Sequence, residues 1–194
     1  MKKKMSSKSK ILTAIAAAKA APQPLPKMNN YAGLSEDKCQ YFLDALEGLG
    51  VEVIMANHKQ ELVSLIKQRS VEGPVYCGIK DIGVTALAEG QDLSSLNLAV
   101  VEGKWGVAEN GAIWVEGDDL PHRALTAIAT NLMIALPSDR ILWNMHEAYQ
   151  KIAPQQQGYG VFISGPSKTA DIEQSLVKGA HGAKSLTVFI YNKE

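Results

Sequence analysis

The chain has 194 residues, enough for one domain with a sizeable core and too few for two. Twenty basic side chains balance twenty acidic ones, so there is no net charge to attract nucleic acid or a membrane surface, and no nucleic-acid partner is expected. The two cysteines, Cys39 and Cys77, stand apart in apolar surroundings and cannot form a four-cysteine iron–sulfur or zinc site.

Residues 1–34 predict a helix followed by a proline-rich arm. Ser6 or Ser7 can cap a short helix with three large apolar side chains on one face: Ile11, Leu12 and Ile15. The three prolines of residues 21–26 cannot continue that helix. The lysines and alanines of the first twenty residues also resemble a signal peptide, which keeps a secreted protein as the alternative. No stretch is apolar enough to span a bilayer, and we expect a cytoplasmic protein.

The main body, residues 35–194, begins with a helix that Ser35 can cap and then alternates strands with helices. Short apolar runs rich in β-branched residues predict strands at 51–55, 75–79, 96–101, 112–115, 131–136, 160–164 and 186–191. Helical spacing of apolar residues predicts helices at 58–68, 141–152 and 169–178. Strands and helices that alternate with short connections imply βαβ units. We therefore predict a three-layer, Rossmann-like α/β domain with a mostly parallel sheet.

Residues 160–182 predict an anion-binding turn. A strand ends at Gly165, and a turn carrying Ser167 and Lys168 leads to a helix predicted to start near Thr169. Such a joint presents free backbone N–H groups at the positive end of a helix, while lysine adds charge and the hydroxyls add donors. The segment is not a P-loop, because no lysine directly follows the glycine. The structural alternative is that Ser167 or Thr169 only caps the helix.

This segment reads GPSKTADIE followed by LVKGAHG, and it closely resembles the C-terminal signature of the LUD-domain family of bacterial lactate-utilisation proteins. That signature is usually GPSRTADIE with a following GxHGP, and the rest of the chain resembles the family in outline. Ala183 stands where the family usually has proline, and Lys168 keeps the charge of the family's arginine without its bidentate fork. His181 lies in the GAHG turn, where the imidazole can face a pocket or lie at the surface.

The segment GVAENGA, residues 106–112, is similar to the family's GIAETGT turn, with Asn110 and Ala112 in place of both threonines. Asn-Gly between two apolar runs is a strong hairpin signal, and a plain hairpin is one interpretation. The family is similar in fold to the superfamily of CoA transferases and sugar-phosphate isomerases. In CoA transferases a glutamate in an E-N-G turn attacks the acyl-CoA thioester, so the resemblance implies that Glu109 is a candidate catalytic carboxylate.

Arg123 lies near the place where family members carry an arginine before a strand that ends in Leu-Pro. It can bind a carboxylate bidentately, or form a structural ion pair with one of three acidic residues: Glu116, Asp118 or Asp119. We expect the turn from Gly165 to Thr169 to form an anion cradle at the carboxyl ends of the strands, with Glu109 facing the same cleft.

The resemblance implies a role in oxidising L-lactate to pyruvate together with two partner proteins that carry iron–sulfur clusters. No flavin, nicotinamide or haem motif is present, so we expect no cofactor or metal in this chain, which would be the cluster-free member. It would bind an anionic small molecule or dock an iron–sulfur partner. Two alternatives stay open: an enzyme that acts on a CoA ester or phosphorylated sugar through Glu109, and a stand-alone binding protein unconnected with lactate.

Overall fold

The computed structural model describes residues 6–20, 37–79, 82, 93–152, 158–170, 176–178 and 182–192. The chain divides into two units, Met1–Tyr31 and Ala32–Glu194. The first unit holds α1 (Ser7–Ala18), and its predicted cap is confirmed: the Ser6 hydroxyl accepts a hydrogen bond from the Ser9 amide at 3.2 Å. The three large apolar side chains of α1 are exposed: Ile11, Leu12 and Ile15. Among the described residues, no helix has the length and apolar character needed to cross a membrane.

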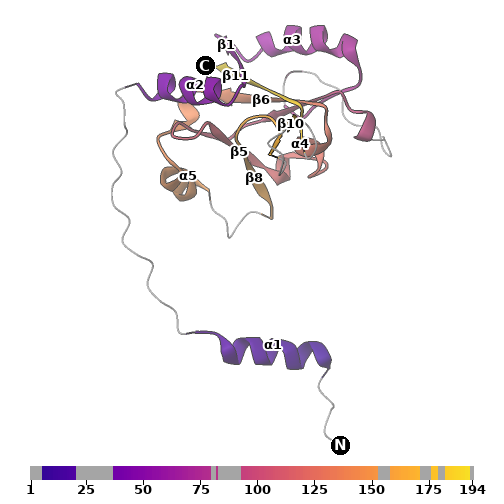
Figure 1. The fold of residues 1–194 in the computed structure, drawn as a ribbon, viewed down its shortest axis with the longest axis vertical. Coiled ribbons are helices and arrows are strands. Elements are labelled where there is room, and N and C mark those ends of the chain that lie inside the picture. The colour runs from indigo at the N-terminus through magenta and orange to yellow at the C-terminus, as the bar shows by residue number, and fades with distance from the viewer. Residues whose placement is uncertain are drawn as a thin grey trace, which may run out of the picture. The chain divides into compact units, whose positions relative to one another are not determined.

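A five-stranded parallel sheet lies at the centre of the second unit (Figure 1). Its strands lie side by side in the order β1 (Glu52–Ala56), β11 (Ser185–Tyr191), β6 (Asn131–Pro137), β3 (Leu98–Glu102) and β2 (Val75–Cys77). Six of the seven residues of β6 are buried, as expected for a parallel strand covered on both faces. The predicted α/β class with a mostly parallel sheet is confirmed.

One face of this sheet is covered by α3 (Glu61–Arg69), whose buried Leu62 and Ile66 pack in one cluster with Met133 and Phe189. On the other face α2 (Lys38–Gly48) and a second sheet share a core that contains Phe42, Leu46, Ile113, Ile134 and Val188. A sheet therefore covers part of the face where a three-layer fold would place helices (Figure 1).

The second sheet has the strand order β7 (Ile141–Leu142), β4 (Trp105–Val107), β5 (Ala112–Glu116) and β8 (Gly160–Ile163). β5 pairs antiparallel with both β4 and β8, and β7 runs parallel to β4. The helix α5 (Met145–Lys151) covers the outer face of this sheet, where Ala148 and Ile152 pack with Trp114. Because β8 belongs to this sheet, the expectation that the Gly165 turn follows a strand of the parallel sheet is wrong.

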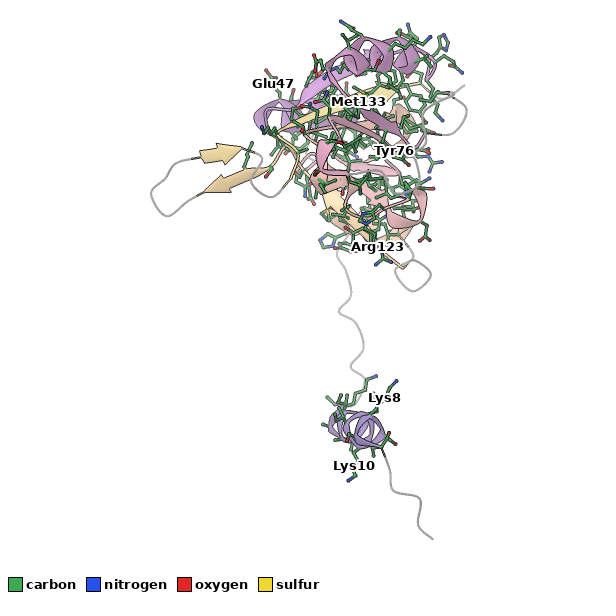
Figure 2. All side chains as sticks on the ribbon, turned by 90° about the vertical axis from the view of Figure 1, so that its right-hand side faces the viewer. Lys8, Lys10, Glu47, Tyr76, Arg123 and Met133 are labelled. Carbon is green, nitrogen blue, oxygen red and sulfur yellow. The ribbon has the colours of Figure 1, made fainter. Side chains whose placement is uncertain are left out.

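The helix predicted over residues 169–178 is also wrong in the part that the structure describes. β9 (Lys168–Ala170) and β10 (Leu176–Lys178) pair as an antiparallel hairpin in which Thr169 lies opposite Val177. Figure 2 shows this hairpin projecting from the body of the unit. Both paired residues are β-branched, a side-chain type that favours strands over helices.

Two helix starts differ from the predicted ones. The predicted cap Ser35 lies outside the described residues, and Asp37 caps α2 by accepting a hydrogen bond from the Gln40 amide at 3.0 Å. The helix predicted from residue 141 begins only at Met145, because Ile141 and Leu142 form β7. The remaining regular elements of the second unit are short: α4 (Leu125–Ile128) and four single-turn helices, η1 (Ser70–Glu72), η2 (Leu93–Ser95), η3 (Gly117–Asp119) and η4 (Ser138–Arg140).

A polar network ties β1 to β11 and α3. The Thr187 hydroxyl donates to the Glu52 carboxylate at 2.7 Å, and the Arg69 guanidinium donates to the same carboxylate at 2.6 Å. The Thr187 hydrogen bond holds the pKa of Glu52 below its usual value, with help from Arg69 and against the opposing effect of burial. The carboxylate therefore stays ionised and keeps both partners at neutral pH.

Candidate functional site

A groove of about 530 Å³ brings together four of the predicted anion-binding residues: Arg123, Gly165, Ser167 and Lys168. We call it the Arg123–Lys168 groove. The described residues that line it include two cationic side chains and no carboxylate. Its other lining residues include four aliphatic side chains: Leu132, Val161, Ile163 and Leu186. The groove thus combines positive charge with an apolar surface.

Arg123 is held by an aromatic ring. Its guanidinium carbon lies 5.0 Å from the centroid of the Tyr159 ring, and Tyr159 also lines the groove. Figure 2 shows Arg123 at the end of the unit that lies away from α3. Stacking holds the guanidinium by its face and leaves its in-plane N–H groups to donate to a ligand. Asp119, one of the ion-pair partners considered for Arg123, pairs with Lys104 at 3.0 Å instead.

The Gly165 turn requires glycine. Gly165 has a φ of +86°, and a Cβ atom there would lie 3.3 Å from the Cβ of Leu49. After the turn, the Ser167 amide donates to the Ala183 carbonyl at 2.9 Å, which places the segment that follows His181 beside Ser167. His181 itself lies outside the described residues, and of Thr169 only the backbone is described.

No helix follows this turn in the described residues; the strand β9 follows it instead. The structure therefore does not support the expected attraction between a bound anion and the N-terminal end of a helix. The positive end of a helix dipole would otherwise have added to the attraction of an anion. What remains is the charge of the exposed Lys168, the Ser167 hydroxyl and the guanidinium of Arg123 across the groove. Any anion binding here must depend on these side chains.

The turn at Glu109 is a hairpin between β4 and β5, as one of the two interpretations predicted. Gly111 has a φ of +66°, and its amide donates to the Val107 carbonyl at 2.9 Å. The Glu109 carboxylate accepts a hydrogen bond from the Met145 amide at 2.7 Å, at the first residue of α5. Glu109 therefore adds an acceptor at the start of α5, where Asn144 is the N-cap, and it is not among the residues that line the Arg123–Lys168 groove.

The backbones of the two predicted turns nevertheless lie side by side. The Ser164 hydroxyl donates to the Asn110 carbonyl at 2.7 Å. Gly111 and Gly165 both approach Leu49, where a Cβ on Gly111 would lie 2.8 Å from the Leu49 Cδ1 atom. The two turns are thus neighbours, but the Glu109 side chain, which was expected to face the same cleft, is directed to α5.

Two substitutions of Glu109 can separate a structural role of this carboxylate from a chemical one. Glu109→Gln keeps an oxygen that can accept the Met145 amide, so we expect it to lower stability by less than about 0.5 kcal/mol and to leave function intact. Glu109→Ala removes this acceptor while the Asn144 cap stays in place, and it should cost about 1 kcal/mol, measured by equilibrium urea unfolding. Loss of function in a stably folded Glu109→Gln protein would contradict this assignment and indicate a chemical role for the carboxylate.

A second groove, of about 390 Å³, was missed by sequence reasoning. It lies at the carboxyl ends of three strands of the parallel sheet, where Glu102, Pro137 and Tyr191 are the last residues of β3, β6 and β11. Its cationic side chains are Lys59, Lys104 and Arg140. The available signal was the position of charged residues directly after apolar strands, which is where ligands bind in open α/β sheets.

Charges within this second groove are partly paired. Lys104 lies 3.0 Å from Asp119 and 3.9 Å from Glu102. Burial lowers the pKa of Lys104, but the Asp119 hydrogen bond and the neighbouring carboxylates outweigh it and raise the pKa above its usual value. For the phenol of Tyr191, burial raises the pKa, and the nearby carboxylates of Glu102 and Asp139 add to this effect. Lys104 is therefore a protonated donor and Tyr191 a neutral phenol at neutral pH.

The two cysteines are protonated thiols. Burial raises the pKa of Cys39, with Asp37 adding to the effect, and burial also raises the pKa of Cys77. Neither therefore has the thiolate character of a reactive cysteine or a metal ligand. Within the described ranges, no group of three or more histidine, cysteine, aspartate or glutamate side chains could hold a metal ion.

Comparisons with known proteins place this geometry in context. A family model described as the LUD domain matches residues 90–191. Lactate utilization protein C 1 of Bacillus mycoides (strain KBAB4) is 23% identical over 188 residues, which cover 81% of this chain and 80% of that protein. Lactate utilization protein C of Oceanobacillus iheyensis is 26% identical over 90 residues, 43% of this chain and 39% of that protein. The crystal structure of a DUF162 family protein from Deinococcus radiodurans has a similar fold, with a TM-score of 0.62 at 18% identity, covering 80% of this chain and 96% of that one.

Proposed function

The chain belongs to the LUD domain family, and from this premise we propose that it acts in lactate utilisation and binds a small carboxylate in the Arg123–Lys168 groove. Two relatives with the name lactate utilization protein C support the pathway. In this proposal the chain is the cluster-free member of a system that oxidises L-lactate to pyruvate. Partner proteins with iron–sulfur clusters carry the electrons, because chemistry of this kind belongs to cofactors.

The observation that carries the proposal is the lining of the groove. Arg123 offers a planar fork that can hold a carboxylate by two parallel hydrogen bonds, and Lys168 adds a second positive charge. The half-buried Val161 and Ile163 offer an apolar surface to the carbon part of the ligand. A volume of about 530 Å³ lies in the range of pockets that hold small organic molecules.

The rival proposal, an enzyme that attacks a CoA ester or phosphorylated sugar through Glu109, has less support. A nucleophilic carboxylate must reach its substrate, whereas the Glu109 carboxylate accepts the Met145 amide at 2.7 Å. A third possibility is a stand-alone binding protein that uses the same groove but has no role in lactate utilisation. Deleting the gene for such a protein would not affect growth on L-lactate. Genetics therefore separates it from the proposed function.

The test is deletion of the gene in the source organism, followed by growth on L-lactate as the sole carbon source. We expect the deletion to abolish growth on L-lactate while growth on glucose continues at the parental rate. The wild-type gene and the Glu109→Gln gene should restore growth, whereas a gene with both Arg123→Ala and Lys168→Ala should not. Parental growth of the deletion strain on L-lactate would contradict the assignment to this pathway.

A further inference from the structure

The topology of the parallel sheet opens a crevice at its carboxyl edge. β1 leads into α3, which covers one face, whereas β6 leads through η4 into β7 and the second sheet on the other face. β11 lies between β1 and β6. Because the connections from β1 and β6, which flank β11, leave to opposite faces, neither connection fills the space at the carboxyl end of β11. This is the usual place for a ligand in an open α/β sheet.

The second groove occupies this crevice, and we call it the carboxyl-edge groove. Lys59 and Gln60, which follow β1, line one wall, and Arg140, which follows β6, lines the other. Tyr191 and Asn192 of β11 and the turn after it lie between them. No lining residue is shared with the Arg123–Lys168 groove.

The two grooves lie at opposite ends of the same strands. In β6, Leu132 lines the Arg123–Lys168 groove and Pro137 lines the carboxyl-edge groove. In β11, Leu186 and Tyr191 are related in the same way. Five residues of extended strand separate the members of each pair by about 16 Å, so one small molecule cannot fill both grooves.

Arg140 is positioned to donate into the groove. Its guanidinium carbon lies 4.8 Å from the centroid of the Trp105 ring, and stacking of this kind leaves the in-plane N–H groups to a ligand. The Asp139 carboxylate forms an ion pair with the Arg140 Nε atom at 3.9 Å, which is too long for a hydrogen bond, so the guanidinium N–H groups can still donate to a ligand. Arg140 therefore supplies charge and directed donors on its wall, opposite the positive charge of Lys59.

Asn192 is oriented by a neighbouring side chain. The Ser138 hydroxyl donates to its Oδ1 atom at 3.0 Å, which fixes the amide and leaves the Nδ2 group as a donor. Lys104 lies 3.0 Å from Asp119 and 3.9 Å from Glu102, so these carboxylates largely balance its charge and it serves mainly as a hydrogen-bond donor. The lining is more polar than that of the Arg123–Lys168 groove, although Pro137 and Tyr191 add apolar surface to it.

We propose that the carboxyl-edge groove is a second ligand site, which takes a small polar dianion, a phosphate or a dicarboxylate, between Lys59 and Arg140. Two cations on opposite walls match the two negative charges of such a ligand. The Asn192 amide donates to the same anion, and Gln60 and Glu102 face the hydroxyl groups of a larger molecule that carries it.

The test is calorimetric titration of the full chain with inorganic phosphate and, in a separate arm, with malonate, at constant ionic strength set by sodium chloride. We expect saturable one-to-one binding of one or both probes. Lys59→Ala and Arg140→Gln should each weaken binding about tenfold, because each removes one charge-assisted contact. Lys67→Ala, on an exposed position of α3 that does not line the groove, and Lys168→Ala should leave binding unchanged.

Which probes bind, and which variants lose affinity, decides whether the proposed site exists. Binding of phosphate alone or malonate alone supports the site and identifies the class of anion. Absence of saturable binding of both probes would overturn the proposal, as would an equal loss in Lys67→Ala or a selective loss in Lys168→Ala. Lys59→Ala alters a loop side chain, so it keeps the test valid even if Arg140→Gln perturbs the packing of Trp105. Failure here would leave the lactate proposal untouched, because the two sites share no residue.

Discussion

Substituting Gly160 with alanine is expected to lower the free energy of unfolding by about 2–3 kcal/mol. A Cβ atom at this position would overlap the ring of Trp114, and even the Trp114 Cε2 atom would be only 2.9 Å away. Trp114 is buried, and its ring packs against Phe162 at a centroid distance of 4.8 Å. The indole cannot yield without disturbing this cluster, so β8 must move away from β5, with which it pairs.

Equilibrium urea unfolding measures this effect, and Gly158→Ala provides a matched control. A Cβ atom on Gly158 would meet nothing nearer than the Arg123 Nη2 atom at 3.9 Å, so its effect should stay within about 0.5 kcal/mol. Adding Trp114→Phe to Gly160→Ala should recover part of the loss, which a double-mutant cycle would report as coupling. Equal effects of the two glycine substitutions would contradict the proposed overlap.

Removing both cations of the Arg123–Lys168 groove should weaken L-lactate binding about 100-fold, with about tenfold for each single substitution. Arg123→Ala removes the fork that holds the carboxylate, and Lys168→Ala removes the second charge. Both side chains are exposed, so we expect little change in the melting temperature. Wild-type affinity should also fall as salt rises, because exposed charges are screened.

Calorimetric titration of L-lactate measures these affinities, and Lys184→Ala is the matched control. Lys184 is exposed and lies two residues after Gly182, which lines the groove, but it does not itself line it. Its substitution removes the same charge from the same region and should leave the affinity unchanged. An equal loss in Lys184→Ala would mean that only the regional charge matters, and an unchanged double variant would move the lactate site elsewhere.

The central strands were the most predictable part of the fold. Residues 131–136 and 186–191 were expected as strands and are found as β6 and β11 to within one residue at each end. Their runs are apolar without alternation, which is typical of parallel strands buried on both faces. By contrast, β4 has three residues and β7 has two, too few to show any period. These two strands therefore could not be predicted, whereas β5 and β8 were expected as strands at 112–115 and 160–164, without any sign that they belong to a second sheet.

The site was predictable only in part. Lys168 was chosen from the chemistry of its turn and Arg123 from a family resemblance. The structure brings both to one groove, but the helix expected after Lys168 is a strand. The partner of Glu109 is a backbone amide 36 residues away, which no local pattern can reveal. Lys59 and Arg140 follow apolar strands, which is a signal in the sequence, but the order of β1 and β6 in the sheet, which places them at one groove, comes only from the tertiary fold.

The position of β11 has a consequence for how the protein is made. β11 is synthesised after the four other strands of the parallel sheet, yet it lies between β1 and β6. Until residues 185–191 have left the ribosome, β1 lacks its neighbour in the described sheet, and β6 presents an open edge with an apolar surface. Open edges of this kind pair readily with other chains. To complete the sheet, β1 must pair with β11, and this brings together Glu52 and Thr187, which are far apart in the sequence. Contacts between residues so distant in sequence form slowly during folding. The β6 edge of the nascent chain is therefore open to pairing with other chains until β11 is in place, held by the polar network of Glu52, Thr187 and Arg69.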